Sequence, residues 1–72
     1  MEYPVIVFKD EDGVFIARCP VFKGAHTYGM SEAEALQNIK EVLQMCEEEM
    51  AKEGPEAVID PHFVEIKQVL LA

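Results

Sequence analysis

The sequence has 72 residues, half of them hydrophobic, and its 14 acidic and six basic residues give a formal net charge of −8 at pH 7. This length predicts one small domain over residues 1–72 and excludes a two-domain enzyme and a doubly wound nucleotide-binding fold. The hydrophobic content is too high for intrinsic disorder, and no apolar run approaches the ~18 residues of a membrane span.

Three short strands are predicted in the first thirty residues. They cover residues 3–8, 14–19 and 25–28, which contain the β-branched and aromatic side chains that strands favour. Pro4 lies at the start of the first strand, where a missing amide hydrogen is tolerated. Asp12 and Gly13 provide the turn between the first two strands, because glycine readily adopts a positive φ. The three strands are therefore expected to form an antiparallel meander.

A long helix is predicted from about Ser31 to about Lys52. Ser31 and Glu34 have the spacing of a capping box, in which the hydroxyl accepts from a first-turn amide and the carboxylate reaches back to the cap amide. The apolar residues that follow recur at three- and four-residue steps and form one stripe: Ala35, Leu36, Ile39, Val42, Leu43, Cys46 and Met50. Gly54 and Pro55 end the helix in the expected order.

A fourth strand is predicted over residues 62–71, where Val64, Ile66 and Leu70 alternate with Glu65 and Lys67. The expected fold is α+β in the order β-β-β-α-β, an antiparallel-rich sheet with one long helix on one face. One helix covers only one face, yet both strand parities carry apolar residues. An uncovered apolar face and a homo-oligomer, dimer or higher, are therefore expected, although the pattern does not select the parity.

Enzyme motifs are absent, and the candidate reactive residues each have a simpler structural interpretation. A thiol–imidazole pair could be built from Cys19, Cys46, His26 and His62, but Cys46 lies on the apolar stripe and nothing marks Cys19 as activated. Asp10, Glu11 and Asp12 could hold a hard cation, but their spacing is not that of an EF-hand, so a solvated turn is favoured. We therefore predict a non-enzyme with no catalytic residue, cofactor or metal.

Negative charge is concentrated in residues 41–60. Seven acidic residues and one base, Lys52, fall there, so this segment holds six of the eight excess charges. Such a field repels a phosphate backbone, which argues against direct nucleic-acid binding, and attracts a basic protein. The candidate partner-binding residues are Glu41, Glu47, Glu48, Glu49 and Glu53. The alternative is a solvated helix face that only aids solubility.

The order of features resembles the HicB antitoxin family. The similarity includes a strand that begins Tyr3-Pro4, the acidic turn at residues 9–13 and the string at residues 24–39. The family pattern is matched at Gly24, Thr27, Gly29, Ser31, Glu34, Ala35, Leu36, Asn38 and Ile39. The chain departs from it at Lys23, Ala25 and Met30, where proline, cysteine and aspartate are usual, and these departures fall in a loop.

The resemblance implies a partial ribonuclease-H-like unit without nuclease function. Members of the family bind and neutralise small basic HicA-type toxins that cleave messenger RNA, and the family supplies no catalytic residue to transfer. Many members also carry a C-terminal DNA-binding segment. Because this sequence ends at Ala72, directly after the predicted fourth strand, operator binding is not expected.

The sequence thus predicts an antitoxin-type protein that masks a small basic toxin. The N-terminus lacks a secretion signal and the two cysteines do not form a disulfide framework, so a cytoplasmic, reducing location without membrane association is expected. One alternative is an orphan oligomeric scaffold or ligand-binding domain with no toxin partner. A second is a degenerate metal-dependent nuclease that uses Asp10, Glu34 or Asp60.

Overall fold

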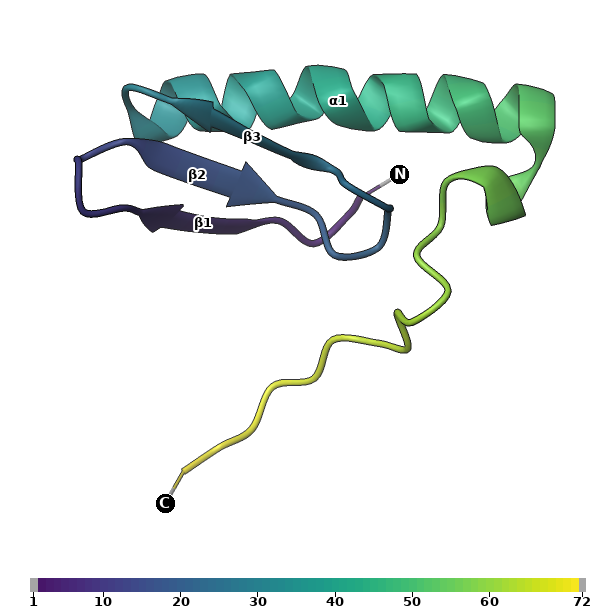
Figure 1. Ribbon diagram of the computed structural model, residues 1–72. Coiled ribbons are helices and arrows are strands. Elements are labelled where there is room, and N and C mark those ends of the chain that lie inside the picture. The colour runs from purple at the N-terminus through teal and green to yellow at the C-terminus, as the bar shows by residue number, and fades with distance from the viewer. Residues whose placement is uncertain (1, 72) are drawn as a thin grey trace.

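The protein is an α+β fold in which three strands precede one long helix. The computed structural model describes residues 2–71; the two ends of the predicted single domain, Met1 and Ala72, lie outside the described residues. The elements in chain order are β1 (Ile6–Lys9), β2 (Phe15–Arg18), β3 (His26–Gly29), α1 (Glu32–Glu53) and the 3-10 turn η1 (Pro55–Ala57). Helix α1 lies along one side of the sheet, and the other side is uncovered (Figure 1).

The sheet is the antiparallel meander that the sequence predicts, with strand order β1-β2-β3. Its first turn is built around one aspartate. Asp10 Oδ1 accepts hydrogen bonds from the amides of Asp12 at 2.9 Å and Val14 at 3.0 Å. Gly13 has φ +82°, a value that side-chain-bearing residues rarely adopt. The acidic loop is thus a hydrogen-bonded turn that fixes the β1–β2 register.

Helix α1 begins and ends close to the predicted residues. Ser31 is the N-cap, and its hydroxyl accepts from the amide of Glu34 at 3.1 Å. Glu34 completes the cap differently from the expectation, because its carboxylate accepts from the amide of Met30 at 3.1 Å, one residue before the cap amide. At the other end Gly54, with φ +91°, donates its amide to the carbonyl of Met50 at 2.9 Å.

Small residues bring the helix close to the sheet. Ala17 of β2 and Ala35 of α1 have no exposed surface, and Ile39 is buried beside them. Leu36, which the stripe included, is instead 43% exposed, because it lies about 100° around the helix from Ala35 and leaves the line of contact. The remaining members of the predicted stripe, Val42, Leu43, Cys46 and Met50, are half-buried.

A second core cluster closes the end of the sheet where β2 leaves it. It consists of the buried side chains of Cys19, Phe22, Ala25 and Val58. A β-bridge pairs Phe22 with Ile59. On either side of it the amide of Lys23 donates to the carbonyl of Val58 at 2.8 Å, and the amide of Asp60 donates to the carbonyl of Val21 at 2.9 Å. The chain that follows α1 is therefore anchored to the loop between β2 and β3.

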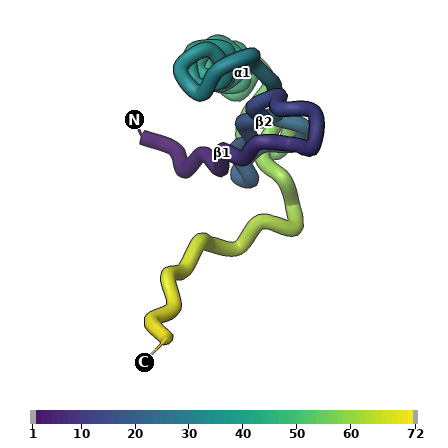
Figure 2. Tube along the Cα trace, turned by 90° about the vertical axis from the view of Figure 1, so that its left-hand side faces the viewer, coloured from purple at the N-terminus to yellow at the C-terminus, as the bar shows by residue number. Residues whose placement is uncertain are grey.

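The predicted fourth strand does not form within this chain. Residues 63–71, called the arm below, are extended but have no strand partner among residues 2–71. Both views show the arm running away from the body on the side of the sheet opposite α1 (Figures 1 and 2). Alternating side chains specify a strand-like backbone, but a strand also needs an edge to pair with. The observed order is β-β-β-α followed by an extended arm.

None of the helices in residues 2–71 combines the length and the apolar character needed to cross a membrane.

Candidate interaction surfaces

The two cysteines have packing roles. Cys19 is 1% exposed and belongs to the second core cluster, against which Cys46 packs from α1. Both are free of disulfide bonds. Burial raises the pKa of the Cys46 thiol above its ordinary value, with smaller contributions from Cys19 and Glu49, so the neutral form is favoured at physiological pH. A protonated thiol is a poor nucleophile.

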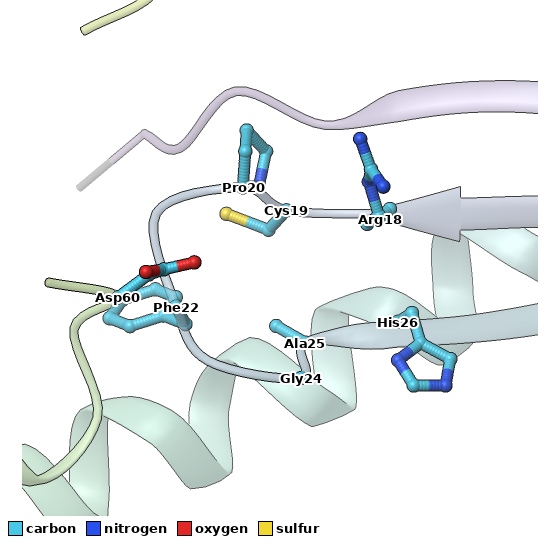
Figure 3. Close-up of a pocket in the computed structure, with 8 residues that line it drawn as sticks. All are labelled: Arg18, Cys19, Pro20, Phe22, Gly24, Ala25, His26 and Asp60. Atoms are coloured by element: carbon cyan, nitrogen blue, oxygen red, sulfur yellow. The ribbon is translucent and has the colours of Figure 1, made fainter. Parts of the chain in front are cut away.

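The structure does not assemble a thiol–imidazole pair. Cys19 and His26 line the same open cavity of about 350 Å³, together with Arg18, Pro20, Phe22, Gly24, Ala25 and Asp60. Figure 3 shows the imidazole of His26 pointing away from the sulfur of Cys19. His62 is exposed in the turn before the arm, where its backbone amide donates to Asp60 Oδ1 at 2.9 Å.

Three of the five carboxylates considered for a metal site bind backbone amides, and the other two, Glu11 and Asp12, are exposed. Asp10 holds the first turn, Glu34 caps α1, and Asp60 accepts from the amide of His62. Within residues 2–71 no group of three or more histidine, cysteine or carboxylate side chains is placed to hold a metal ion. These three residues therefore have local structural roles.

The acidic residues of α1 surround the helix and do not form one flat patch. All five candidate partner-binding glutamates are exposed: Glu41, Glu47, Glu48, Glu49 and Glu53. Glu41 and Glu48 are seven residues apart, two helical turns, and share the face away from the sheet. Glu47 and Glu49 differ by about 200° around the axis and lie on opposite flanks. A partner on the outer face would thus contact two glutamates directly and experience the others as a surrounding field.

One of these glutamates is tied to the N-terminal segment. The hydroxyl of Tyr3 donates to Glu47 Oε2 at 3.2 Å, and the ring of Tyr3 packs edge-on against Phe22 with centroids 5.0 Å apart. Burial, followed by this hydrogen bond, raises the pKa of Tyr3 above its ordinary value of 10.0. The folded state thus favours the neutral phenol.

This shift predicts a pH dependence of stability. A group whose pKa is raised by folding contributes stability below its unfolded pKa and loses it as the pH rises through the folded pKa. The free energy of unfolding should therefore fall more steeply above about pH 10 in the wild type than in Tyr3→Phe, which has no phenol to ionise. Urea denaturation at a series of pH values measures both slopes, and equal slopes would show that Tyr3 is not coupled to folding.

The uncovered face of the sheet carries a row of large apolar side chains beside Arg18 and His26. In the register of the sheet Phe8, Ile16 and Tyr28 lie side by side across the three strands, with Ile6 next to them on β1. Tyr28 is 65% exposed and Phe8 48%. The even-numbered residues of the three strands therefore form the uncovered face, a choice that the sequence pattern left open. The small residues Ala17 and Gly29 could have indicated it, because they lie on the opposite face, where the helix comes close.

The two edges of the sheet differ. On β3 the outward amide of His26 donates to Gly24 at 3.0 Å, and the outward carbonyl of Tyr28 accepts from Asn38 Nδ2 at 2.8 Å. On β1 the amide of Asp10 donates to the carbonyl of Val14, and in an antiparallel pair every second residue is hydrogen-bonded to the neighbouring strand. The backbone groups of Val7 and Lys9 therefore point away from β2. These groups have no hydrogen-bond partner within residues 2–71. The β1 edge is the open one.

Comparison with known proteins identifies several relatives of similar size. The chain is 33% identical over 70 residues to the UPF0150 protein ssr1258 of Synechocystis, covering 97% of this chain and 94% of the relative. It is 42% identical over 52 residues to the UPF0150 protein Ta0767 of Thermoplasma acidophilum, covering 72% and 75%. A UPF0150 protein of Archaeoglobus fulgidus is 28% identical over 67 residues, covering 93% and 97%.

None of these names states an activity or a partner. No family model and no solved structure matches the chain. The match to ssr1258 nonetheless extends over almost the full length of both proteins, and the chain belongs to the UPF0150 family.

Proposed function

We propose that this protein is an antitoxin-type binding module that neutralises a small basic ribonuclease of the HicA type by masking its surface. The observation that carries the proposal is the acidic C-terminal half of α1, whose glutamates are exposed around the helix. Residues 41–60 contain seven acids and one base. A protein that binds RNA presents a basic surface, and an acidic protein can occupy that surface in place of the RNA.

The resemblance to HicB antitoxins supports the proposal through residues that hold the fold. Ser31 and Glu34 cap α1, and Asn38 binds the β3 edge. Gly29 and Ala35 form the close contact between β3 and the helix. Residues with these roles account for the part of the resemblance that concerns the β-β-β-α fold. The proposal includes no catalytic step and no operator binding, and the protein acts by association alone.

The electrostatic part of the proposal predicts a salt-sensitive association rate. Exposed ion pairs contribute little individually, typically below ~1 kcal/mol, so the effect should come from several glutamates acting together. Changing Glu48, Glu49 and Glu53 together to glutamine should slow association with the toxin about three- to tenfold at low salt. The difference should shrink as the Debye length falls below ~8–10 Å. Stopped-flow or surface-plasmon measurements at two salt concentrations give both rates.

A matched control changes the same amount of charge at positions outside the C-terminal half of α1. Glu11→Gln, Asp12→Asn and Glu32→Gln alter exposed residues in the first turn of the sheet and at the start of the helix. This control should slow association much less. If the two triple variants behave alike, or if wild-type binding is indifferent to salt, the acidic half of α1 does not guide the toxin.

The uncovered sheet face favours a second function, that of an oligomeric scaffold or ligand-binding domain with no toxin partner. An exposed apolar surface of this kind is typical of an interaction site. The two functions differ in their genetic context. A reading frame for a short basic protein next to the gene supports the antitoxin function, and its absence supports the scaffold.

A further inference from the structure

The arm is an apolar segment exposed to solvent. Its apolar residues are Phe63, Val64, Ile66, Val69, Leu70 and Leu71. Val64, Val69, Leu70 and Leu71 each expose more than four-fifths of their surface. Glu65 and Lys67 form an ion pair of 2.9 Å, so these two polar side chains share one side of the extended backbone. Phe63, Val69 and Leu71 lie on that side too. The other side carries Val64, Ile66, Gln68 and Leu70 and no charged residue, and it is called the apolar side of the arm below.

Hydrogen bonds at the base of the arm set its direction. The amide of Asp60 donates to Val21 at 2.9 Å, which ties this residue to the body. Asp60 then accepts from the amides of His62 at 2.9 Å and Phe63 at 3.1 Å, through its side chain and its carbonyl. Pro61 restricts the backbone between them. The arm thus leaves the body through a defined turn, and folding back onto its own sheet would require opening that turn.

A sheet edge with which an arm could pair lies on the same side of the molecule. The uncovered face and the arm both lie opposite α1 (Figures 1 and 2). Beside that face is the open β1 edge, at which Val7 and Lys9 present unpaired backbone groups. An extended segment can add to such an edge as a further strand. Nine residues at ~3.3 Å each span about 30 Å, more than the four residues of β1 need.

Charge favours a second copy of this chain as the partner on this side. The arm is neutral, because Glu65 and Lys67 balance. The two cross-strand rows of the uncovered face contain Arg18 and His26 and no acidic residue. A basic protein has no reason to prefer this surface. Two copies related by a twofold axis would satisfy both arms and both edges at once, while their acidic helices stay on the outside.

We propose that two copies exchange their arms. Each arm lies as a fourth strand along the β1 edge of the other copy, with its apolar side next to Ile6 and Phe8 of that copy. The two uncovered faces then pack against each other at the ~10 Å spacing of stacked sheets. The proposal does not depend on the antitoxin function. It restores the strand that the sequence predicts and supplies its edge from a second molecule.

The test uses sedimentation velocity on the full chain and three variants. Ile66→Asp places a charge on the apolar side of the arm. Val7→Pro removes an amide that points away from β2 and leaves the ladder bonds between β1 and β2 in place. Met45→Asp is the matched control, because Met45 is 60% exposed on α1, away from the arm and the uncovered face. If circular dichroism shows Val7→Pro to be unfolded, Lys9→Pro replaces it, since its amide also points outward.

The wild type should be a dimer at micromolar concentration. Ile66→Asp and Val7→Pro should each raise the dimer dissociation constant at least about tenfold, and Met45→Asp should change it less than about twofold. An equimolar mixture of Ile66→Asp and Val7→Pro should dimerise more tightly than either alone, because one intact arm then meets one intact edge. A monomeric wild type, an unchanged Ile66→Asp, or a mixture no tighter than its components would overturn the exchange. The last result would place the arm on its own sheet.

Discussion

Replacing Phe22 with alanine is expected to lower the free energy of unfolding by about 3–5 kcal/mol. Phe22 is 3% exposed and fills the second core cluster. Its backbone pairs with Ile59, and its ring contacts Tyr3 edge-on at a centroid separation of 5.0 Å. Removal of the ring therefore leaves a cavity where three parts of the chain meet. Urea denaturation followed by circular dichroism measures the loss.

This effect is large for so small a protein. A domain of this length has a total stability of about 4–11 kcal/mol, so the Phe22→Ala variant should be close to unfolding at physiological temperature. Met45→Ala, which truncates an exposed side chain of α1, should change the free energy of unfolding by less than about 0.5 kcal/mol. A loss below about 1 kcal/mol for Phe22→Ala would mean that this cluster does not hold the C-terminal part of the chain to the sheet.

Gly29→Ala is expected to destabilise the protein by steric overlap, at about 1–3 kcal/mol. A Cβ at position 29 would lie 2.5 Å from the backbone nitrogen of Ala35 and 2.9 Å from the carbonyl carbon of Glu34. Both neighbours are backbone atoms, so the start of α1 must move away from β3. The amide of Ala35, which donates to Ser31 at 3.0 Å, should then exchange with solvent faster, as hydrogen-exchange NMR can measure.

Gly13→Ala provides the contrast for this variant. A Cβ at Gly13 would meet no atom within 4 Å, but the residue has φ +82°. Its cost, about 1 kcal/mol, should therefore come from backbone strain and leave the Ala35 amide unaffected. If Gly29→Ala is no more destabilising than Gly13→Ala and does not change exchange at Ala35, the close approach of helix and strand is not a constraint.

The parts of the fold that could be predicted are those with local causes. Ser31 and Gly54 end the helix through hydrogen bonds to residues within one turn. Gly13 closes the hairpin through its own backbone conformation. The fourth strand could not be predicted in the same way, since alternation at Val64 and Ile66 specifies an extended backbone and says nothing of its partner.

For the candidate surfaces too, features set by the sequence itself could be predicted and features set by packing could not. The acidic character of residues 41–60 is visible in the sequence, because charge is additive. How those charges surround α1, with Glu47 held by Tyr3, depends on the packing of the helix. The uncovered face and the open β1 edge depend on register, which only the paired strands define. The closure of the β3 edge required a tertiary contact, the hydrogen bond from Asn38 to Tyr28.

The most direct test of the proposed function is the rate of RNA cleavage by a small basic ribonuclease of the HicA type. The rate is followed by release of a fluorophore from a labelled RNA while the acidic protein is added in increasing amounts. We predict that cleavage falls to background near an equimolar ratio, and that the variant in which Glu48, Glu49 and Glu53 are glutamine reaches inhibition more slowly. Unchanged cleavage at a severalfold molar excess of the wild-type protein would contradict the antitoxin function.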